Sequence, residues 1–302
     1  MKTTISNYWV HDWDPFLWQF PDSFSHFGPG GIRWYGIAYL AGFISAFFLL
    51  KRYHKCKRSP YNSEQVMNLM TFMVLGVLLG GRIGYALLYR WGEFMEDPLI
   101  LLRVWEGGMA SHGGFVGVCT AVLWYARHSK QSPFPIGDII VSVVPPGLFF
   151  GRIANFINGE LWGKVTNGSW GVIFPNEKES KAVFLLNPEF KNDPSLIPPV
   201  ILEELARHPS QLYAATLEGL CTFVFVQWRF WKSDVTKRAP GRLAGEFLIA
   251  YAIARIINEF FRQPDASLVL GMSRGQFYSL FLVLGGAILI RIAEIRAKKS
   301  LN

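Results

Sequence analysis

Charged side chains stand inside long apolar runs of this chain, where they are costly and therefore informative. Arg152 and Arg255 each lie within such a run, and Glu259 and Arg262 follow Arg255 at helical spacings. A charge at the centre of a bilayer costs about 2.5–3.5 kcal/mol even on the lenient insertion scale, so each needs a partner or a function. From this single helix, an Arg255–Glu259 pair that only neutralises itself and a functional site are equally good interpretations.

A second set of polar residues follows Arg152 in the string GRIANFINGELWG at 151–163. Asn155 lies one helical turn after Arg152, and Asn158 and Glu160 stand where the apolar run ends. Asparagine commonly ends a helix and begins a turn, which accounts in part for Asn158. A turn signal does not explain an arginine inside the run, so the string predicts a polar site near the end of a membrane helix.

Two further residues could serve proton transfer or binding. His112 lies in MASHGGFVGV near the start of an apolar run, and histidine in general can accept a proton near neutral pH. A lone histidine beside glycines is more often structural, and Tyr35 in GGIRWYG can equally belong to an interfacial aromatic belt. No HExxH or Cys-x-x-Cys pattern occurs, so we predict neither a metal site nor a cofactor.

The elements that must position these residues are predicted to be membrane helices. Of the 302 residues, 51% are hydrophobic and only 17% are charged, which is far from the usage of soluble domains. Apolar runs of about 18–25 residues recur, and each is long enough to cross a bilayer. The formal net charge of +8 comes from short loops rather than from a basic stripe, which argues against nucleic-acid binding.

We therefore predict an all-α integral membrane protein with about seven transmembrane helices. The basic loop KRYHKCKR at 51–58 and the basic tail at 293–302 should be cytoplasmic, which puts the N-terminus outside and the C-terminus inside. The predicted spans cover about 32–50, 65–89, 109–126, 136–157, 209–231, 243–261 and 276–292.

This topology divides the rest of the chain into predicted parts. Residues 1–31 form an aromatic, acidic interfacial arm outside, and 32–157 hold the first four spans with an external arm near 90–108. Residues 158–208 are polar, rich in Gly, Pro and Asn, and too long for a tight turn, which predicts a small extracytoplasmic head domain. Residues 209–292 hold the last three spans.

Four strings of the chain carry a family resemblance when they are taken together. They are GRIANFINGELWG, SHGG at 111–114, HPSQLY at 208–213 and ARIINEFFRQPD at 254–265. In their order along the chain they closely resemble the prolipoprotein diacylglyceryl transferase family, and the likeness extends along most of the chain. Ala214 follows HPSQLY where glutamate is frequent in that family. The sequence thus leaves open whether the outer end of the fifth span contributes an acidic side chain.

The resemblance implies a transferase that acts on phosphatidylglycerol. The enzyme would move the sn-1,2-diacylglyceryl group to the lipobox cysteine in the signal peptide of a prolipoprotein, which forms a thioether and releases glycerol phosphate. It also implies a multi-pass protein of the bacterial inner (cytoplasmic) membrane with its active site toward the periplasm.

The resemblance further implies a set of lipid-binding residues. Arg152 and Arg255 would hold the phosphate, because guanidinium stays charged and can grip a phosphate with two donors at once. Asn158 would orient the head group, and Glu259 would position the arginines or bind the glycerol hydroxyls. The expected set for phosphatidylglycerol is completed by Tyr35 and Arg262.

The expected catalytic residues overlap with that set. His112 would be the base for the attacking thiol, because little thiolate exists at neutral pH without help. Alternatively, the arginines alone would lower the pKa of the thiol, and His112 would only orient it. Arg255, Asn155 and Glu160 would stabilise or orient the reacting head group. An alternative is a multi-pass transporter or lipid carrier that uses the same charges without covalent chemistry, although the matched repeats typical of transporters are not found.

Overall fold

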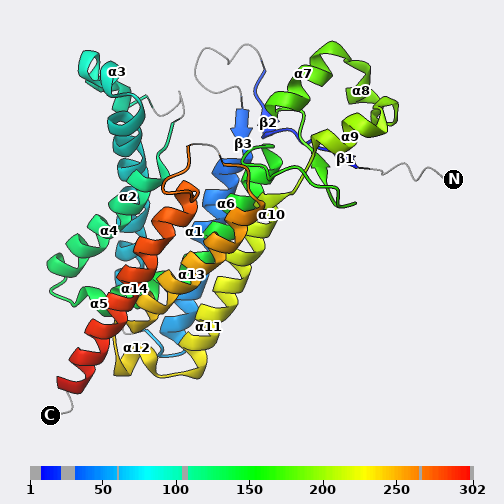
Figure 1. Ribbon diagram of the computed structural model, residues 1–302. Coiled ribbons are helices and arrows are strands. Elements are labelled where there is room, and N and C mark those ends of the chain that lie inside the picture. The colour runs from blue at the N-terminus through cyan, green and yellow to red at the C-terminus, as the bar shows by residue number, and fades with distance from the viewer. Residues whose placement is uncertain (1–7, 22–30, 60, 104–107, 265–266, 300–302) are drawn as a thin grey trace.

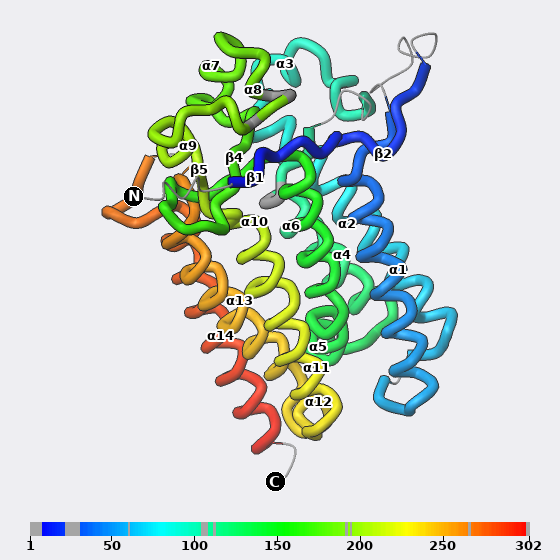
Figure 2. The backbone as a smooth tube through the Cα atoms, turned by 90° about the vertical axis from the view of Figure 1, so that its right-hand side faces the viewer, coloured from blue at the N-terminus to red at the C-terminus, as the bar shows by residue number. Residues whose placement is uncertain are grey.

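The computed structural model describes residues 8–21, 31–59, 61–103, 108–264 and 267–299, without the side chains at 111, 112, 191, 192 and 194. Most of these residues are helical. The longer helices run side by side as a bundle, and short strands and helices cover one end of it (Figures 1 and 2). The C-terminus lies at the opposite end.

The bundle is built from helices that match the predicted spans in order. They are α1 (Trp34–Lys55), α2 (Ser63–Tyr89), α4 (Ser111–His128), α5 (Pro133–Val143), α6 (Pro145–Ile157), α13 (Arg242–Phe261) and α14 (Arg274–Lys299). Between α6 and α13, one further long helix is formed by α10 (Ser210–Ala214), the π-helix η5 (Ala215–Cys221) and α11 (Thr222–Lys232). The short α12 (Val235–Arg238) joins α11 to α13 at the end that holds the C-terminus (Figure 1).

Three helices, α1, α2 and α14, are long and apolar enough to cross a membrane by themselves. The pair α5–α6 is a fourth candidate, bent by 41° at its break. Pro145 and Pro146 explain the bend, because proline lacks the N–H that continues a helix. The predicted helical membrane class is thus confirmed, whereas the count of seven spans and their topology remain predictions.

The crossing of α2 and α4 requires glycine. A Cβ added at Gly76 would lie 2.7 Å from the carbonyl oxygen of Gly117, and one added at Gly84 would lie 2.6 Å from the Cα of Gly113. Small residues let membrane helices approach through their backbones. Gly113 lies in the first turn of α4, so this crossing fixes where α4 begins. The backbone of His112, the preceding residue, is fixed with it.

The short strands and helices that cover this end of the bundle come from two parts of the chain, the head segment (158–208) and the N-terminal arm (8–21). In its three-stranded sheet, β1 (Trp9–Val10) runs parallel to β4 (Val172–Ile173), which pairs antiparallel with β5 (Ala206–Arg207). Tyr8 and Val10 pack with the helices of the head in one small hydrophobic core. These helices are α7 (Lys178–Leu186), α8 (Glu189–Asn192), η4 (Pro194–Leu196) and α9 (Pro199–Leu205).

Two other pieces lie at the same end of the bundle. The hairpin of β2 (Phe16–Gln19) and β3 (Gly31–Arg33) leads directly into α1. The short helices α3 (Trp91–Glu96) and η2 (Pro98–Leu101) follow α2 and form the segment predicted as an external arm. Buried Arg82 of α2 donates hydrogen bonds to the carbonyls of Ile100, Leu101, Arg103 and Gly108, so this arginine of a candidate span holds the arm in place.

The start of α13 is held by a carboxylate from another helix. Fully buried Asp138 of α5 accepts hydrogen bonds from the backbone N–H groups of Gly241 and Ala244, each at 2.8 Å. Gly241 has a φ of +95°, a conformation that glycine adopts without a Cβ penalty. Asp138 therefore caps α13 and fixes the helix that carries Arg255 and Glu259.

Candidate functional site

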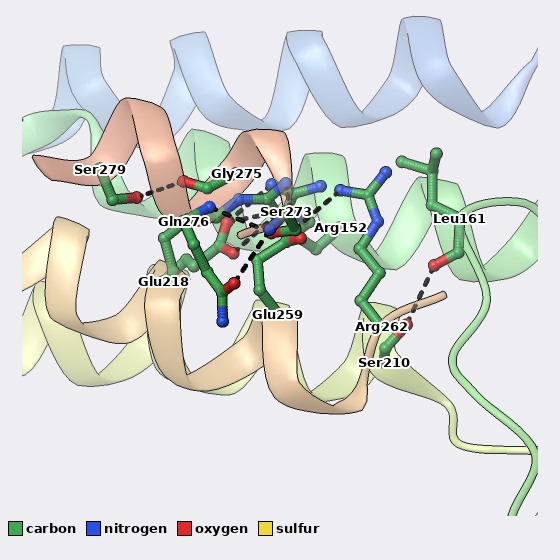
Figure 3. A network of polar contacts seen from close by, with 11 residues as sticks. Arg152, Leu161, Ser210, Glu218, Glu259, Arg262, Ser273, Gly275, Gln276 and Ser279 are labelled. Atoms are coloured by element: carbon green, nitrogen blue, oxygen red, sulfur yellow. Dashed lines mark hydrogen bonds and ion pairs between the residues drawn. The ribbon is translucent and has the colours of Figure 1, made fainter. Parts of the chain in front are cut away.

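The side chains of Arg152 and Arg255 meet at a single buried carboxylate, Glu218. Arg152 donates to Glu218 Oε2 from Nε at 3.0 Å and from Nη2 at 2.7 Å, and Arg255 Nη1 donates to Oε1 at 3.2 Å. Glu218 has no exposed surface. Two guanidinium groups from α6 and α13 are thus tied to one residue of the π-helix η5 (Figure 3).

Glu259 extends the network along α13. Its Oε1 lies 2.7 Å from Arg255 Nη2 and 3.3 Å from Arg262 Nη1. Figure 3 shows Glu259 beside Ser273, Gly275 and Gln276 at the start of α14. Hydrogen bonds between the side chain of each of Ser273 and Gln276 and the backbone N–H of the other form a capping box there.

The charges of this network do not cancel. Three arginines face two carboxylates, so the formal charges of the network leave one net positive charge. The side chains of Arg152 and Arg255 keep 19% and 14% of their surface exposed, whereas that of Glu218 keeps none. Since each guanidinium has five N–H donors and Glu218 takes only some of them, the exposed edges can bind an anion.

A second polar cluster lies close by along α6. Asn155 Nδ2 donates to Glu160 Oε1 at 2.8 Å, and the Tyr35 hydroxyl contacts both Asn155 and Glu160. Gln211 Nε2 donates to the Glu160 carbonyl at 2.6 Å. The start of α1, the last turns of α6 and the start of α10 therefore converge on Glu160.

The turn after α6 explains how Glu160 returns toward Asn155. The N–H of Gly159 bonds to the carbonyl of Phe156, and the N–H of Glu160 bonds to that of Asn155 at 3.1 Å. Gly159 has a φ of +61°, which glycine adopts at no steric cost. Asn158 and Gly159 thus end the helix and turn the chain so that the Glu160 carboxylate lies beside α6.

Burial raises the pKa of Glu160 above the ordinary value of a glutamate, and the nearby positive charge of Arg33 opposes this shift. Glu160 follows the end of the candidate span at Ile157. A carboxyl group with a raised pKa can carry a proton closer to neutral pH than an ordinary one.

The structure brings together seven of the nine predicted site residues. They form the two clusters just described: Arg152, Arg255, Glu259 and Arg262 in one, and Tyr35, Asn155 and Glu160 in the other.

The other two predicted site residues are Asn158 and His112. Asn158 ends α6, and its buried Oδ1 has no hydrogen-bond partner among the described residues. The backbone of His112 lies in the first turn of α4, but its side chain lies outside the described residues, so its predicted role as a base is untested.

Glu218 is the functional candidate that the sequence analysis missed. It is the single carboxylate between Pro209 and Trp231, so the cost of a charge in a membrane helix was a usable signal. It also answers the question raised by Ala214, because the fifth helix does contribute an acid, one turn further along. Within the described part of the chain, no group of three or more His, Cys, Asp or Glu residues could hold a metal ion.

Comparisons with known proteins agree with the motifs. The family model described as prolipoprotein diacylglyceryl transferase matches residues 21–292. A phosphatidylglycerol–prolipoprotein diacylglyceryl transferase of Idiomarina loihiensis is 43% identical over 292 residues, covering 94% of this chain and 97% of that protein. Proteins of the same name from Pectobacterium atrosepticum and Psychrobacter arcticus are 41% and 42% identical. They cover 90% and 89% of this chain and 93% and 92% of their own lengths, respectively.

Proposed function

The chain belongs to the prolipoprotein diacylglyceryl transferase family, and we propose that it transfers the diacylglyceryl group of phosphatidylglycerol to the lipobox cysteine of prolipoproteins. The observation that carries this proposal is the pair of guanidinium groups held together by buried Glu218. A transporter or lipid carrier has no specific observation in its favour.

The reaction joins sulfur to carbon and expels a phosphate ester. The cysteine sulfur attacks the glyceryl carbon that bears the phosphodiester, the C–S bond forms, and the C–O bond breaks. Its electron pair leaves with glycerol phosphate, and the thiol proton passes to a base. Because an alkyl phosphodiester is a poor leaving group, cationic donors aimed at its oxygens lower the barrier.

Arg152 and Arg255 supply those donors. Both side chains keep some exposed surface while fully buried Glu218 holds them together, so the pair is organised before the lipid arrives. Glu218 touches the arginines rather than the lipid and is a positioning residue. Glu259 orients Arg255 in the same way and keeps Arg262 nearby.

The second cluster binds the rest of the head group. Tyr35, Asn155 and Glu160 present hydroxyl, amide and carboxyl groups that can hydrogen-bond the glycerol hydroxyls. The head groups of phosphatidylcholine and phosphatidylethanolamine have no free hydroxyl, because their single hydroxyl is esterified to the phosphate. This cluster therefore favours phosphatidylglycerol. Asn158 assists in orienting the head group, and His112 accepts the thiol proton.

The protein spans the inner membrane of a bacterium about seven times, with the active site toward the periplasm. In this orientation the head with α7 and α9 is outside, and α12 and the C-terminus are inside (Figure 1). The positive-inside rule supports it, because the basic segments at 51–58, 232–242 and 293–299 all belong to the inner end.

A transfer assay tests the proposal. The purified chain is incubated with phosphatidylglycerol and a peptide that carries a lipobox cysteine, and the product is analysed by mass spectrometry. We expect a thioether-linked diacylglyceryl peptide, none from the cysteine-to-serine peptide, and a loss of at least about 100-fold in rate for Arg152→Ala or Arg255→Ala, as for a buried charged contact. Full activity of either variant, or no thioether from the unaltered chain, would refute it.

A further inference from the structure

A basic cavity opens at the end of the bundle opposite the head. It has a volume of about 470 Å³ and lies between the end of α1, the first turn of α5 and α12. Its walls carry His54 from the last turn of α1, Lys57 and Arg58 from the connection between α1 and α2, and Lys237 from α12. Residues nearly two hundred positions apart thus meet around one cavity far from the arginine network.

Two cations of this cavity have no counter-charge in its wall. None of the described residues that line it is a carboxylate. Lys57 and Lys237 are exposed, and neither forms an ion pair with a described carboxylate. Like charges this close repel one another unless an anion lies between them.

One cation of the cavity is held in place. Arg58 Nη2 donates to the Trp231 carbonyl at 2.7 Å, and Nη1 lies 3.6 Å from Asp234. The Arg58 guanidinium also lies 5.9 Å from the ring centroid of Trp231. An anion entering the cavity therefore meets a pre-positioned guanidinium as well as two exposed ammonium groups.

The rest of the wall is partly apolar. Pro135 and buried Ile139 line the cavity from α5, and Ser59 and Thr236 add hydroxyl groups. The apolar part of the surface suits a ligand with hydrocarbon attached to its anionic group. A free inorganic anion would use only the charges.

We propose that this cavity binds the phosphate head group of an anionic phospholipid of the inner leaflet. The site is separate from the catalytic network and lies at the level where α1 and α5 reach the inner membrane surface in the proposed orientation. Basic pockets between membrane helices on the cytoplasmic side are suited to such head groups. The lipid would hold α12 and the α1–α2 connection together at the foot of the bundle.

Native mass spectrometry of the purified full chain tests the site. Dioleoyl phosphatidic acid is titrated in mild detergent onto the unaltered chain, onto Lys57→Gln/Lys237→Gln, and onto the control Lys298→Gln/Lys299→Gln. Both double variants lose two positive charges at the same end, but the control residues do not line the cavity. We expect the cavity variant to bind the lipid about tenfold more weakly and to retain full transfer activity, and the control to bind normally.

Two results would overturn the proposal. One is equal lipid retention by the two double variants. The other is equal stabilisation by a free phosphate source. Inorganic phosphate would then raise the melting temperature of the unaltered chain as much as the lipid does, and the cavity variant would lose both effects. That result would show that the cavity binds free phosphate and has no preference for a lipid. Phosphatidylcholine, which carries no net charge, should not discriminate between the variants.

Discussion

At the scale of single residues, the candidate site depends on a carboxylate that does not touch the lipid. Glu218 binds Arg152 through two donors and Arg255 through one, and it is completely buried. A buried charge of this kind is stable only with its partners, and removing one partner of a buried pair costs about 3–5 kcal/mol. The two arginines would repel each other without Glu218.

Glu218→Gln should therefore reduce transfer strongly. The amide keeps the size of the side chain but loses the charge that both guanidinium groups need, so we expect a loss of about 100-fold or more in kcat/KM. Activity of Glu294→Gln should stay near normal, since this carboxylate forms only partly exposed pairs with Arg242 and Arg291. Equal activities in the transfer assay would contradict the positioning role.

Glu160 predicts a pH dependence of stability. Its pKa is raised in the folded protein by burial, so the folded state binds the proton more tightly than the unfolded one. Ionisation then costs stability as the pH rises from the ordinary value of 4.5 through the raised folded value. Glu160→Gln removes this cost but keeps an acceptor for Asn155.

The melting temperature of Glu160→Gln minus that of the unaltered chain should thus increase as the pH rises and then level off. Thermal unfolding followed from about pH 4 to about pH 8 measures it. A difference that is constant, or that turns against the variant as the pH rises, would show that the carboxyl is not penalised by burial.

At the scale of elements, the start of α14 fixes the carboxylate of Glu259. A Cβ added at Gly275 would lie 2.6 Å from both Cδ and Oε1 of Glu259. That carboxylate is already tied to Arg255 and Arg262, so it cannot move without breaking these contacts. The capping box of Ser273 and Gln276 holds the first turn of α14 against it.

Gly275→Ala should consequently lower transfer activity by about tenfold, the effect expected when one ion pair of the network is displaced by roughly 1–2 kcal/mol. Gly285→Ala on the same helix is the matched control, because nothing lies within 4 Å of a Cβ added there. Helix propensity favours alanine at both positions, so a loss confined to Gly275→Ala isolates the contact with Glu259. Similar activities would argue against it.

At the scale of the whole molecule, the bundle has two chemically different ends. The head, the hairpin of β2 and β3, and the external arm lie at one end, and the basic connections and α12 lie at the other (Figures 1 and 2). The proposed active site is near the head and the proposed lipid cavity is at the basic end. The orientation of the bundle in the membrane therefore assigns each site to a leaflet.

Thiol labelling measures that orientation. Cys56 is exposed in the basic connection after α1, so a membrane-impermeant maleimide should label it in inverted membrane vesicles and not in intact spheroplasts. In a Cys56→Ser background, Ser195→Cys places an exposed thiol in the head and should show the opposite pattern. Labelling of Cys56 from the outside would reverse the proposed topology.

The sequence by itself determined the helical membrane class, the family and most members of the site. Hydrophobic run length reports directly on membrane crossing. Arg152, Arg255 and Glu259 stood out because charge in such runs is costly, and Asn155 stood out as a polar side chain beside Arg152. Helical spacing also placed Arg152 and Asn155 one turn apart, as found on α6.

Only the tertiary structure decided which helices share a partner. That Glu218 joins Arg152 to Arg255 depends on the packing of η5 between α6 and α13, and a spacing rule along one helix carries no information about the next helix. The same holds for β1, which the N-terminal arm adds to the head sheet, and for Asp138, which caps α13 from α5. These contacts join segments far apart in the chain, and their geometry follows from packing rather than from local pattern.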